Sequence, residues 1–394
     1  MNLKEVVIVS GCRTPVASFG KSLRDMTCID LGAIVVKEAV NRAGIQRSDV
    51  DEVVLGQVGQ VAENGFLARS VSLKAGMPIE CGAYSVNRQC GSGLQAIADA
   101  VMEIQTGLAD VVVAGGVESI SQLPYYLRDA RWGAKMGHRV LEDGVTDILT
   151  WPLDGNHNGV TAENVAIQYN ISREEQDRFA MVSHQRAVQA MRAGLFKEEI
   201  VPVVVKDRKG KEITFDVDEG PREDQTMERL SRLKPCFVEG GTVTAANSSS
   251  LNDAAAAVVL MSREKAEELG CKPILSVEGI AVAGYYPELM GYSPKLSSEK
   301  LAKKLSLNLR DIDMFEINEA FASQVVAVAR DLGLDMTKVN IYGGGISIGH
   351  PLGATGCILT VKVMYELMRS DKKDAMISMC IGGGQGISMY VTKC

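Results

Sequence analysis

Residues 85–116, SVNRQCGSGLQAIADAVMEIQTGLADVVVAGG, contain the parts of one strand-turn-helix-strand unit. Apolar residues recur at steps of three and four from Leu94 to Ile104, which predicts a helix with one buried face. Gly107 stands where that helix needs a left-handed C-terminal residue. The β-branched run 110–114 that follows predicts a buried strand.

The same alternation continues toward the N-terminus. Residues 5–10 (EVVIVS) and 52–56 (EVVLG) are apolar runs that predict buried strands, and 31–43 between them predicts a helix. Strands that alternate with helices in this way predict an α/β fold.

The strand-turn-helix-strand unit occurs a second time near the C-terminus. Val86-Asn87 precede the first glycine-rich turn, and Val339-Asn340 precede a second one. Each copy then continues through a helix to a strand that ends in glycines, at 115–116 and at 382–384. Internal similarity of this kind predicts two related α/β halves.

The segment between the copies, 119–250, has a different composition, with long stretches rich in glycine, proline and charged residues. Within it, Ser172 followed by Glu175 forms a capping box that predicts the start of a helix. Long insertions in compact folds usually serve a site. We therefore expect three parts: an N-terminal half (1–118 with 251–271), an inserted loop domain (119–250) and a C-terminal half (272–394).

Composition limits the partners. The chain has 394 residues and a formal net charge of −7, with both signs interspersed, which argues against binding to nucleic acid or to an anionic membrane. The longest apolar run, 254–261, is too short to span a bilayer, and the sequence shows no secretory signal, so we expect a cytoplasmic protein. The nine cysteines are scattered without a C-x-x-C pair and argue against zinc or a disulfide framework.

Cys90 lies at the predicted junction of a strand and a helix. Free backbone N–H groups and the positive end of the helix dipole should lower the pKa of its thiol and favour the nucleophilic thiolate. Two other interpretations remain: a packed structural cysteine, or a dinucleotide fingerprint formed by Gly91, Gly93 and Ala96 with Asp110 as the ribose ligand.

Three further motifs carry groups suited to catalysis. His350 is enclosed by glycine and proline in the segment 349–353 (GHPLG), which would aim its ring as a base. Cys380 ends a predicted strand before the glycine turn 382–386, whose backbone N–H groups could hold an oxyanion. Asn318, after another apolar run, supplies an amide that could orient a water or a ring.

These motifs resemble the thiolase family, the CoA-dependent enzymes that make or cleave 3-ketoacyl-CoA. The resemblance extends along the whole chain and rests on V-N-x-x-C at Cys90, N-E-A-F at Asn318, G-H-P-x-G at His350 and the glycine turn after Cys380. It implies a thiolase-like fold of two α/β halves, each with a five-stranded sheet, and an inserted loop domain. It also implies a homo-oligomer, either a dimer or a dimer of dimers (a homotetramer).

The resemblance further implies the roles of individual residues. Catalytic roles fall to Cys90 as nucleophile, His350 as its base, Cys380 as the second acid and base, Asn318 as the holder of a water, and Gly382 as an oxyanion donor. The loop domain would bind CoA through Arg222 at the adenine end and Ser249 at the pantetheine. The residues that would line the pantetheine and acyl pocket are Leu149, His157, Met290, Ala320 and Phe321.

The implied activity is that of an acetyl-CoA C-acetyltransferase, with acetyl-CoA, acetoacetyl-CoA and CoA as substrates and no bound cofactor or metal. The alternative is a 3-ketoacyl-CoA thiolase that degrades longer or branched acyl chains. One departure bears on this choice: many short-chain thiolases have Met after the pocket histidine, whereas Asn158 follows His157 here. A decarboxylating condensing enzyme or a non-catalytic CoA-binding scaffold would fit the retained motifs less well.

Overall fold

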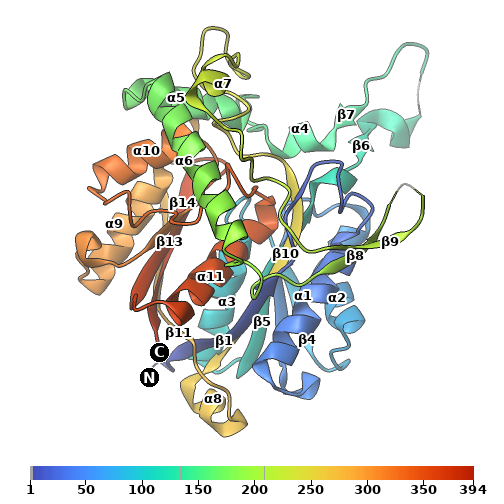
Figure 1. The fold of residues 1–394 in the computed structure, drawn as a ribbon. Coiled ribbons are helices and arrows are strands. Elements are labelled where there is room, and N and C mark those ends of the chain that lie inside the picture. Colours follow the sequence, from blue (N-terminus) through green and yellow to red (C-terminus); the bar gives the residue numbers. More distant parts are fainter. Residues whose placement is uncertain (1–2, 134, 208) are drawn as a thin grey trace.

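The computed structural model describes residues 3–133, 135–207 and 209–394. Its centre is a long mixed sheet with strands from both ends of the chain (Figure 1), in the order β12-β13-β14-β11-β1-β10-β5-β3-β4, with β2 beside β10. The strands of this sheet are β1 (Val6–Arg13), β2 (Ala17–Ser18), β3 (Glu52–Gly56), β4 (Gly82–Val86), β5 (Val111–Ser119), β10 (Asn252–Ser262), β11 (Leu275–Gly284), β12 (Phe315–Ile317), β13 (Asp374–Ile381) and β14 (Gln385–Lys393).

The two halves of the sheet repeat one pattern, which confirms the predicted duplication. In the N-terminal half β4, β3 and β5 run parallel, and β10 and β1 follow antiparallel. In the C-terminal half β12 and β13 run parallel, and β14 and β11 follow antiparallel. The place of β4 is taken in the second half by a single parallel bridge between Val339 and Phe315, so four of the five expected strands form.

The halves join edge to edge. β1 and β11 pair antiparallel at only two positions, Val7 with Ser276 and Ile8 with Leu275. This short junction makes one sheet of the two halves.

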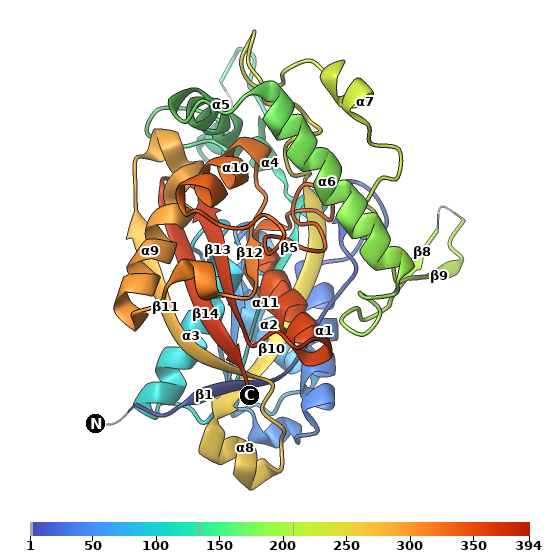
Figure 2. The ribbon, with the colours of Figure 1, turned by 60° about the vertical axis from the view of Figure 1, so that its left-hand side comes forward.

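Helices cover both faces of the sheet (Figures 1 and 2). In the N-terminal half, α1 (Cys28–Ala43) and α2 (Leu67–Ala75) pack on one face, and α3 (Ser92–Thr106) packs on the other. α11 (Leu352–Arg369) lies against α3 and contacts strands of both halves. The outer helices of the C-terminal half are α9 (Ser293–Leu305) and α10 (Ala322–Asp331), and α8 (Arg263–Leu269) follows β10.

The continuously apolar sequence of β5 is explained by its burial on both faces. Val111 and Val113 belong to the hydrophobic cluster formed with α1 and α2, whereas Val112 and Ala114 belong to the cluster formed with α3 and α11. A strand buried on both faces cannot alternate apolar and polar residues. The predicted helix before it ends as expected, since Gly107 caps α3 with a φ of 77°.

The segment between the halves carries the remaining elements. They are β6 (Tyr125–Tyr126), β7 (Glu142–Asp143), α4 (Gly144–Ile148), α5 (Asn158–Gln168), α6 (Arg173–Arg192), β8 (Val203–Lys206), β9 (Glu212–Phe215) and α7 (Met227–Ser231). The predicted capping box is present, because Ser172 and Glu175 each accept the other's backbone N–H at the start of α6. α4, α5 and α7 gather at the end of the molecule opposite α8 (Figures 1 and 2). No helix in the described part of the chain has the length and hydropathy that a bilayer span requires.

Candidate active site

Most of the predicted site residues meet at one cavity of about 250 Å³. Its lining includes the predicted residues Cys90, His350, Leu149, His157, Ser249, Met290, Ala320 and Phe321, together with Asn158, Phe237, Ser248, Ser250, Leu251 and Leu352. Both halves and the segment between them therefore contribute to it. Of the other predicted residues, Gly382 lines a neighbouring cavity, Arg222 lines a third, and Asn318 and Cys380 are fully buried.

A short turn between β4 and α3 holds Cys90. The side chain of Asn87 fixes this turn, since its Oδ1 accepts the Gln89 N–H at 2.9 Å and its Nδ2 donates to the Val58 carbonyl at 3.2 Å. Gln89 has a φ of 47°, in the left-handed region that non-glycine residues rarely adopt. Such a conformation needs support from its surroundings, and Asn87 supplies it.

Two opposing effects act on the pKa of the Cys90 thiol. Backbone N–H groups of Gly382 and of Cys90 itself favour the thiolate, but burial of the sulfur outweighs them and raises the pKa to about 11. The expected lowering of this pKa is therefore wrong, because desolvation exceeds the contribution of the helix terminus. Cys90 is a neutral thiol near pH 7 and needs a base to become a nucleophile.

The ring of His350 is in the protonation state that a base requires. Burial lowers the pKa of its ring to about 4, so the imidazole is neutral near pH 7. Its Nδ1 lies 2.7 Å from Thr355 Oγ1, whose own hydroxyl donates to the Pro351 carbonyl at 2.9 Å. Since that hydroxyl proton is already used, Nδ1 carries the hydrogen and Nε2 is left with a lone pair.

The backbone of His350 is fixed as well. Its N–H donates to Asn252 Oδ1 at 2.8 Å, and Gly349 before it has a φ of 125°. A Cβ on Gly349 would lie 2.5 Å from the Asn252 side chain, so only glycine allows this approach. Pro351 then provides the N-cap of α11.

Two buried side chains lie behind the cavity wall. Asn318 Nδ2 is 3.4 Å from His350 Nε2, while Asn318 Oδ1 has no partner among the described residues. Cys380 packs in a cluster with Met290 and Phe321, where burial and then the charge of a Cys90 thiolate raise its pKa. The two sulfurs therefore interact electrostatically when one of them is ionised.

Arg222 lines a separate cavity of about 310 Å³ that shares Ser248, Ser250 and Leu251 with the cavity at Cys90. Its backbone N–H donates to Nδ1 of His184 at 3.2 Å. Burial, and next the Arg222 charge, lower the pKa of His184 to about 4. A shared wall thus joins the cavity at Cys90 to a polar cavity whose lining includes both Arg222 and Glu219.

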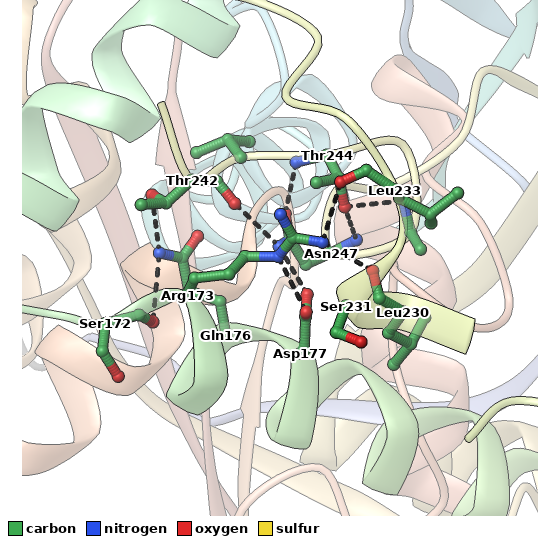
Figure 3. Close-up of polar contacts among 12 residues, drawn as sticks. Ser172, Arg173, Gln176, Asp177, Leu230, Ser231, Leu233, Thr242, Thr244 and Asn247 are labelled. Atoms are coloured by element: carbon green, nitrogen blue, oxygen red, sulfur yellow. Dashed lines mark hydrogen bonds and ion pairs between the residues drawn. The ribbon is translucent and has the colours of Figure 1, made fainter. Parts of the chain in front are cut away.

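The loop 242–250 that forms this shared wall is anchored on α6 (Figure 3). Asp177 accepts hydrogen bonds from Arg173 Nε at 2.7 Å and from Asn247 Nδ2 at 2.9 Å. Asn247 Oδ1 in turn accepts the Thr244 N–H at 2.8 Å. A buried carboxylate therefore sets the path of the loop just before Ser248 and Ser249 reach the cavity.

Several lining and supporting residues were not predicted from the sequence. Phe237 stacks on the His157 ring, with centroids 5.1 Å apart, and meets Phe321 edge to face. Asn252 and Thr355 hold His350. Of these residues only Thr355 could have been found from local spacing, because residues four apart, such as Pro351 and Thr355, lie on the same face of a helix.

The dinucleotide hypothesis is wrong. Asp110 lies directly before β5, where it pairs with Lys4 at 2.9 Å, and not at the carboxyl end of a strand, where a ribose ligand is required. A Cβ on Gly93 would lie 2.7 Å from the Gly353 carbonyl, so the glycine serves close packing of α3 against α11. Among the described residues, no group of His, Cys, Asp or Glu is arranged to hold a metal ion.

A neutral thiol, a neutral imidazole and backbone N–H donors at one cavity are the parts that covalent cysteine catalysis requires. Comparison with known proteins identifies the family. Models of the thiolase N-terminal domain and the thiolase C-terminal domain match residues 6–264 and 271–393. The chain belongs to the thiolase family.

Full-length relatives and solved structures agree with this assignment. The chain is 49% identical over 387 residues to Beta-ketothiolase BktB of Cupriavidus necator, covering 98% of each chain. It is 46% identical to an acetyl-CoA acetyltransferase of Syntrophomonas wolfei, covering 98% of this chain and 99% of the relative. The crystal structure of the Bacillus anthracis acetyl-CoA acetyltransferase has a TM-score of 0.98 at 44% identity, covering 100% of both chains. Human mitochondrial 3-ketoacyl-CoA thiolase in complex with CoA has a TM-score of 0.96 at 40% identity, covering 100% of this chain and 99% of that one.

Proposed function

We propose that the protein is an acetyl-CoA C-acetyltransferase that condenses two molecules of acetyl-CoA and, in reverse, cleaves acetoacetyl-CoA with CoA. The observation that carries this proposal is the meeting of Cys90, its backbone donors and the neutral His350 ring at one cavity. Relatives named acetyl-CoA acetyltransferase that match over the full length support the same reaction.

The first half-reaction transfers an acyl group to Cys90. His350 Nε2 takes the thiol proton, and the thiolate attacks the thioester carbonyl of acetyl-CoA. Charge that develops on the carbonyl oxygen is stabilised by the N–H groups of Cys90 and Gly382. Collapse of the tetrahedral intermediate breaks the bond to the CoA sulfur, which takes the proton of the Cys380 thiol as it leaves, so that Cys380 becomes a thiolate while His350 keeps the Cys90 proton.

The second half-reaction forms the carbon–carbon bond. Cys380 as a thiolate removes a proton from the methyl carbon of a second acetyl-CoA, and the resulting carbanion attacks the acetyl group on Cys90. Protonated His350, through its Nε2–H, and a water held by Asn318 would stabilise the enolate oxygen. As acetoacetyl-CoA forms, the bond to the Cys90 sulfur breaks and this sulfur takes its proton back from His350. Cys380 keeps the proton from the methyl carbon, which restores the resting enzyme, and gives it back when the reaction runs in reverse.

CoA would enter through the two chambers that share a wall. In this proposal residues 119–250 form the CoA-binding loop domain between halves 1–118 with 251–271 and 272–394, Arg222 meets the adenine end, and Ser249 meets the pantetheine. Arg222 gives its cavity a positive charge for the phosphorylated adenine end of CoA, and the aromatic and aliphatic wall of the cavity at Cys90 suits the pantetheine arm. CoA is the substrate, so no resident cofactor is required, and the active form is a homo-oligomer.

A second candidate function is thiolysis of longer or branched 3-ketoacyl-CoA. A specific feature favours it: Asn158 lines both the cavity at Cys90 and a neighbouring cavity of about 420 Å³ that reaches Gly382 and Gly383. An acyl chain on Cys90 that passed Asn158 would find space there.

The test is CoA-dependent cleavage of a 3-ketoacyl-CoA series that begins with acetoacetyl-CoA, compared by kcat/KM. The highest value for acetoacetyl-CoA supports the acetyltransferase. A higher value for longer or branched chains replaces it by the second candidate, and cleavage of none contradicts both.

A further inference from the structure

Glu118 is a buried acid at the end of β5 with an unusual set of partners. Its side chain is 1% exposed, and its carboxylate accepts three backbone N–H groups. Oε2 accepts from Val58 at 3.0 Å and from Gly353 at 2.9 Å, and Oε1 accepts from Gly59 at 3.1 Å. The partners lie in two segments that are far apart in the sequence, the turn after β3 and the first turn of α11.

The first pair of hydrogen bonds leads to the nucleophile. Val58 and Gly59 form the turn after β3, and the Val58 carbonyl accepts the side chain of Asn87. Asn87 holds Gln89 in its left-handed conformation directly before Cys90. Glu118 therefore holds the turn 58–59, and this turn holds Asn87 of the Cys90 turn.

The third hydrogen bond leads to the base. Gly353 lies in the first turn of α11, three residues after His350. A Cβ on Gly353 would lie 2.9 Å from Glu118 Oε2 and 2.7 Å from the Gln57 backbone, which explains the final glycine of the segment 349–353. The carboxylate thus ties the His350 loop of the C-terminal half to the N-terminal half.

The carboxylate is also close enough to affect the thiol electrostatically, since its charge contributes to the raised pKa of Cys90. A buried acid costs free energy unless hydrogen bonds compensate it. Burial raises the pKa of Glu118 to about 7, although the three N–H groups lower it, and all three donors belong to segments that lead to Cys90 or His350.

We propose that Glu118 is a positioning residue that sets the distance between the Cys90 sulfur and His350 Nε2 by clamping the loops that carry them. The proposal rests on the proposed function, because it assigns Glu118 a part in acyl transfer to Cys90. Glu118 touches neither reacting atom; it acts through the turn 58–59 and through Gly353.

The test uses Glu118→Gln, because the amide has the same shape but its NH₂ group opposes one of the three N–H donors. Acetylation of Cys90 by acetyl-CoA is followed by rapid quenching and intact mass, and CoA affinity by calorimetry. The expected result is an acetylation rate at least tenfold lower, within the roughly 10–100-fold that misplacement of reacting groups costs, with CoA affinity unchanged. Glu103→Gln is the matched control: Glu103 is a mostly buried acid of α3 whose partner is the Tyr84 hydroxyl at 2.6 Å, and its variant should acetylate like the wild type.

Two results would overturn the role of Glu118: an acetylation rate like that of the wild type, or an equal loss of CoA affinity and acetylation, which would mean general collapse of the site. Should Glu118→Gln fail to fold, Glu118→Asp decides by the same comparison, since its shorter side chain cannot reach both loops. Absence of acetylation in the wild type would instead contradict the proposed function.

Discussion

The Nδ1 atom of His350 lies 2.7 Å from the hydroxyl oxygen of Thr355, in the next turn of the same chain segment. Because the Thr355 hydroxyl donates to the Pro351 carbonyl, this contact fixes both the tautomer and the direction of the ring. Nε2, and not Nδ1, is the atom that can take the Cys90 proton.

Thr355→Val tests this relationship with an isosteric side chain that has no acceptor. We expect kcat to fall about 10–100-fold, as when a metal-bound histidine loses the partner that orients it, while KM changes little. Thr355→Ser keeps the hydroxyl and should restore most of the activity. Equal kinetics for the Val and Ser variants would show that the hydroxyl does not orient His350.

The resting protonation state of Cys90 predicts a steep pH dependence of alkylation. With a thiol pKa of about 11, only a small thiolate fraction exists at pH 7, and it increases as the pH rises. Labelling of Cys90 by iodoacetamide should therefore accelerate about tenfold per pH unit between pH 7 and pH 10. Peptide mapping separates Cys90 from the exposed Cys236 and Cys394. A labelling rate that is already constant above pH 8 would contradict burial as the dominant influence.

Asn158 is expected to determine the preferred acyl length because it stands between the two cavities. Asn158→Met would fill the passage, so kcat/KM for longer 3-ketoacyl-CoA should fall about 10–200-fold, the range that pocket volume provides. Acetoacetyl-CoA should be cleaved as before. Asn158→Ala, which widens the passage, serves as the opposite control, and unchanged ratios in both variants would remove Asn158 from selectivity.

Asp177 is expected to affect substrate binding through the loop 242–250. Asp177→Ala leaves Arg173 and Asn247 without this acceptor, and loss of one member of a buried charged network costs about 3–5 kcal/mol of the free energy of unfolding. Since the loop lines the cavity but carries none of the proposed catalytic groups, KM for acetyl-CoA should rise more than kcat falls. Glu174→Ala, at an exposed acid of the same helix that pairs with Arg178, is the control. A variant with wild-type KM would show that the loop holds its path without Asp177.

Much of the fold was predictable because it depends on local pattern. The periodicity of 94–104 and the Gly107 cap define α3, and the matching Val86 and Val339 segments reveal the duplication. The weak fifth strand of the second half was not predictable, since strand length there depends on how the chain packs around Val339.

For the candidate site too, residues in local motifs could be predicted, whereas residues that depend on distant partners could not. Residues inside short motifs, such as Cys90 and His350, could be proposed from the sequence because their neighbours carry the signal, and the two line one cavity. Asn252 and Glu118 were missed because their partners are 98 and 235 residues away. The pKa of Cys90 was predicted in the wrong direction because burial, its dominant cause, is a property of the folded chain.

The most direct test of the account is the intact mass of the enzyme after incubation with acetyl-CoA, for the wild type and for Cys90→Ser. We predict one acetyl adduct on the wild type, mapped to Cys90, and none on the variant. An adduct that persists on folded Cys90→Ser, or that maps to another residue in the wild type, would contradict Cys90 as the nucleophile.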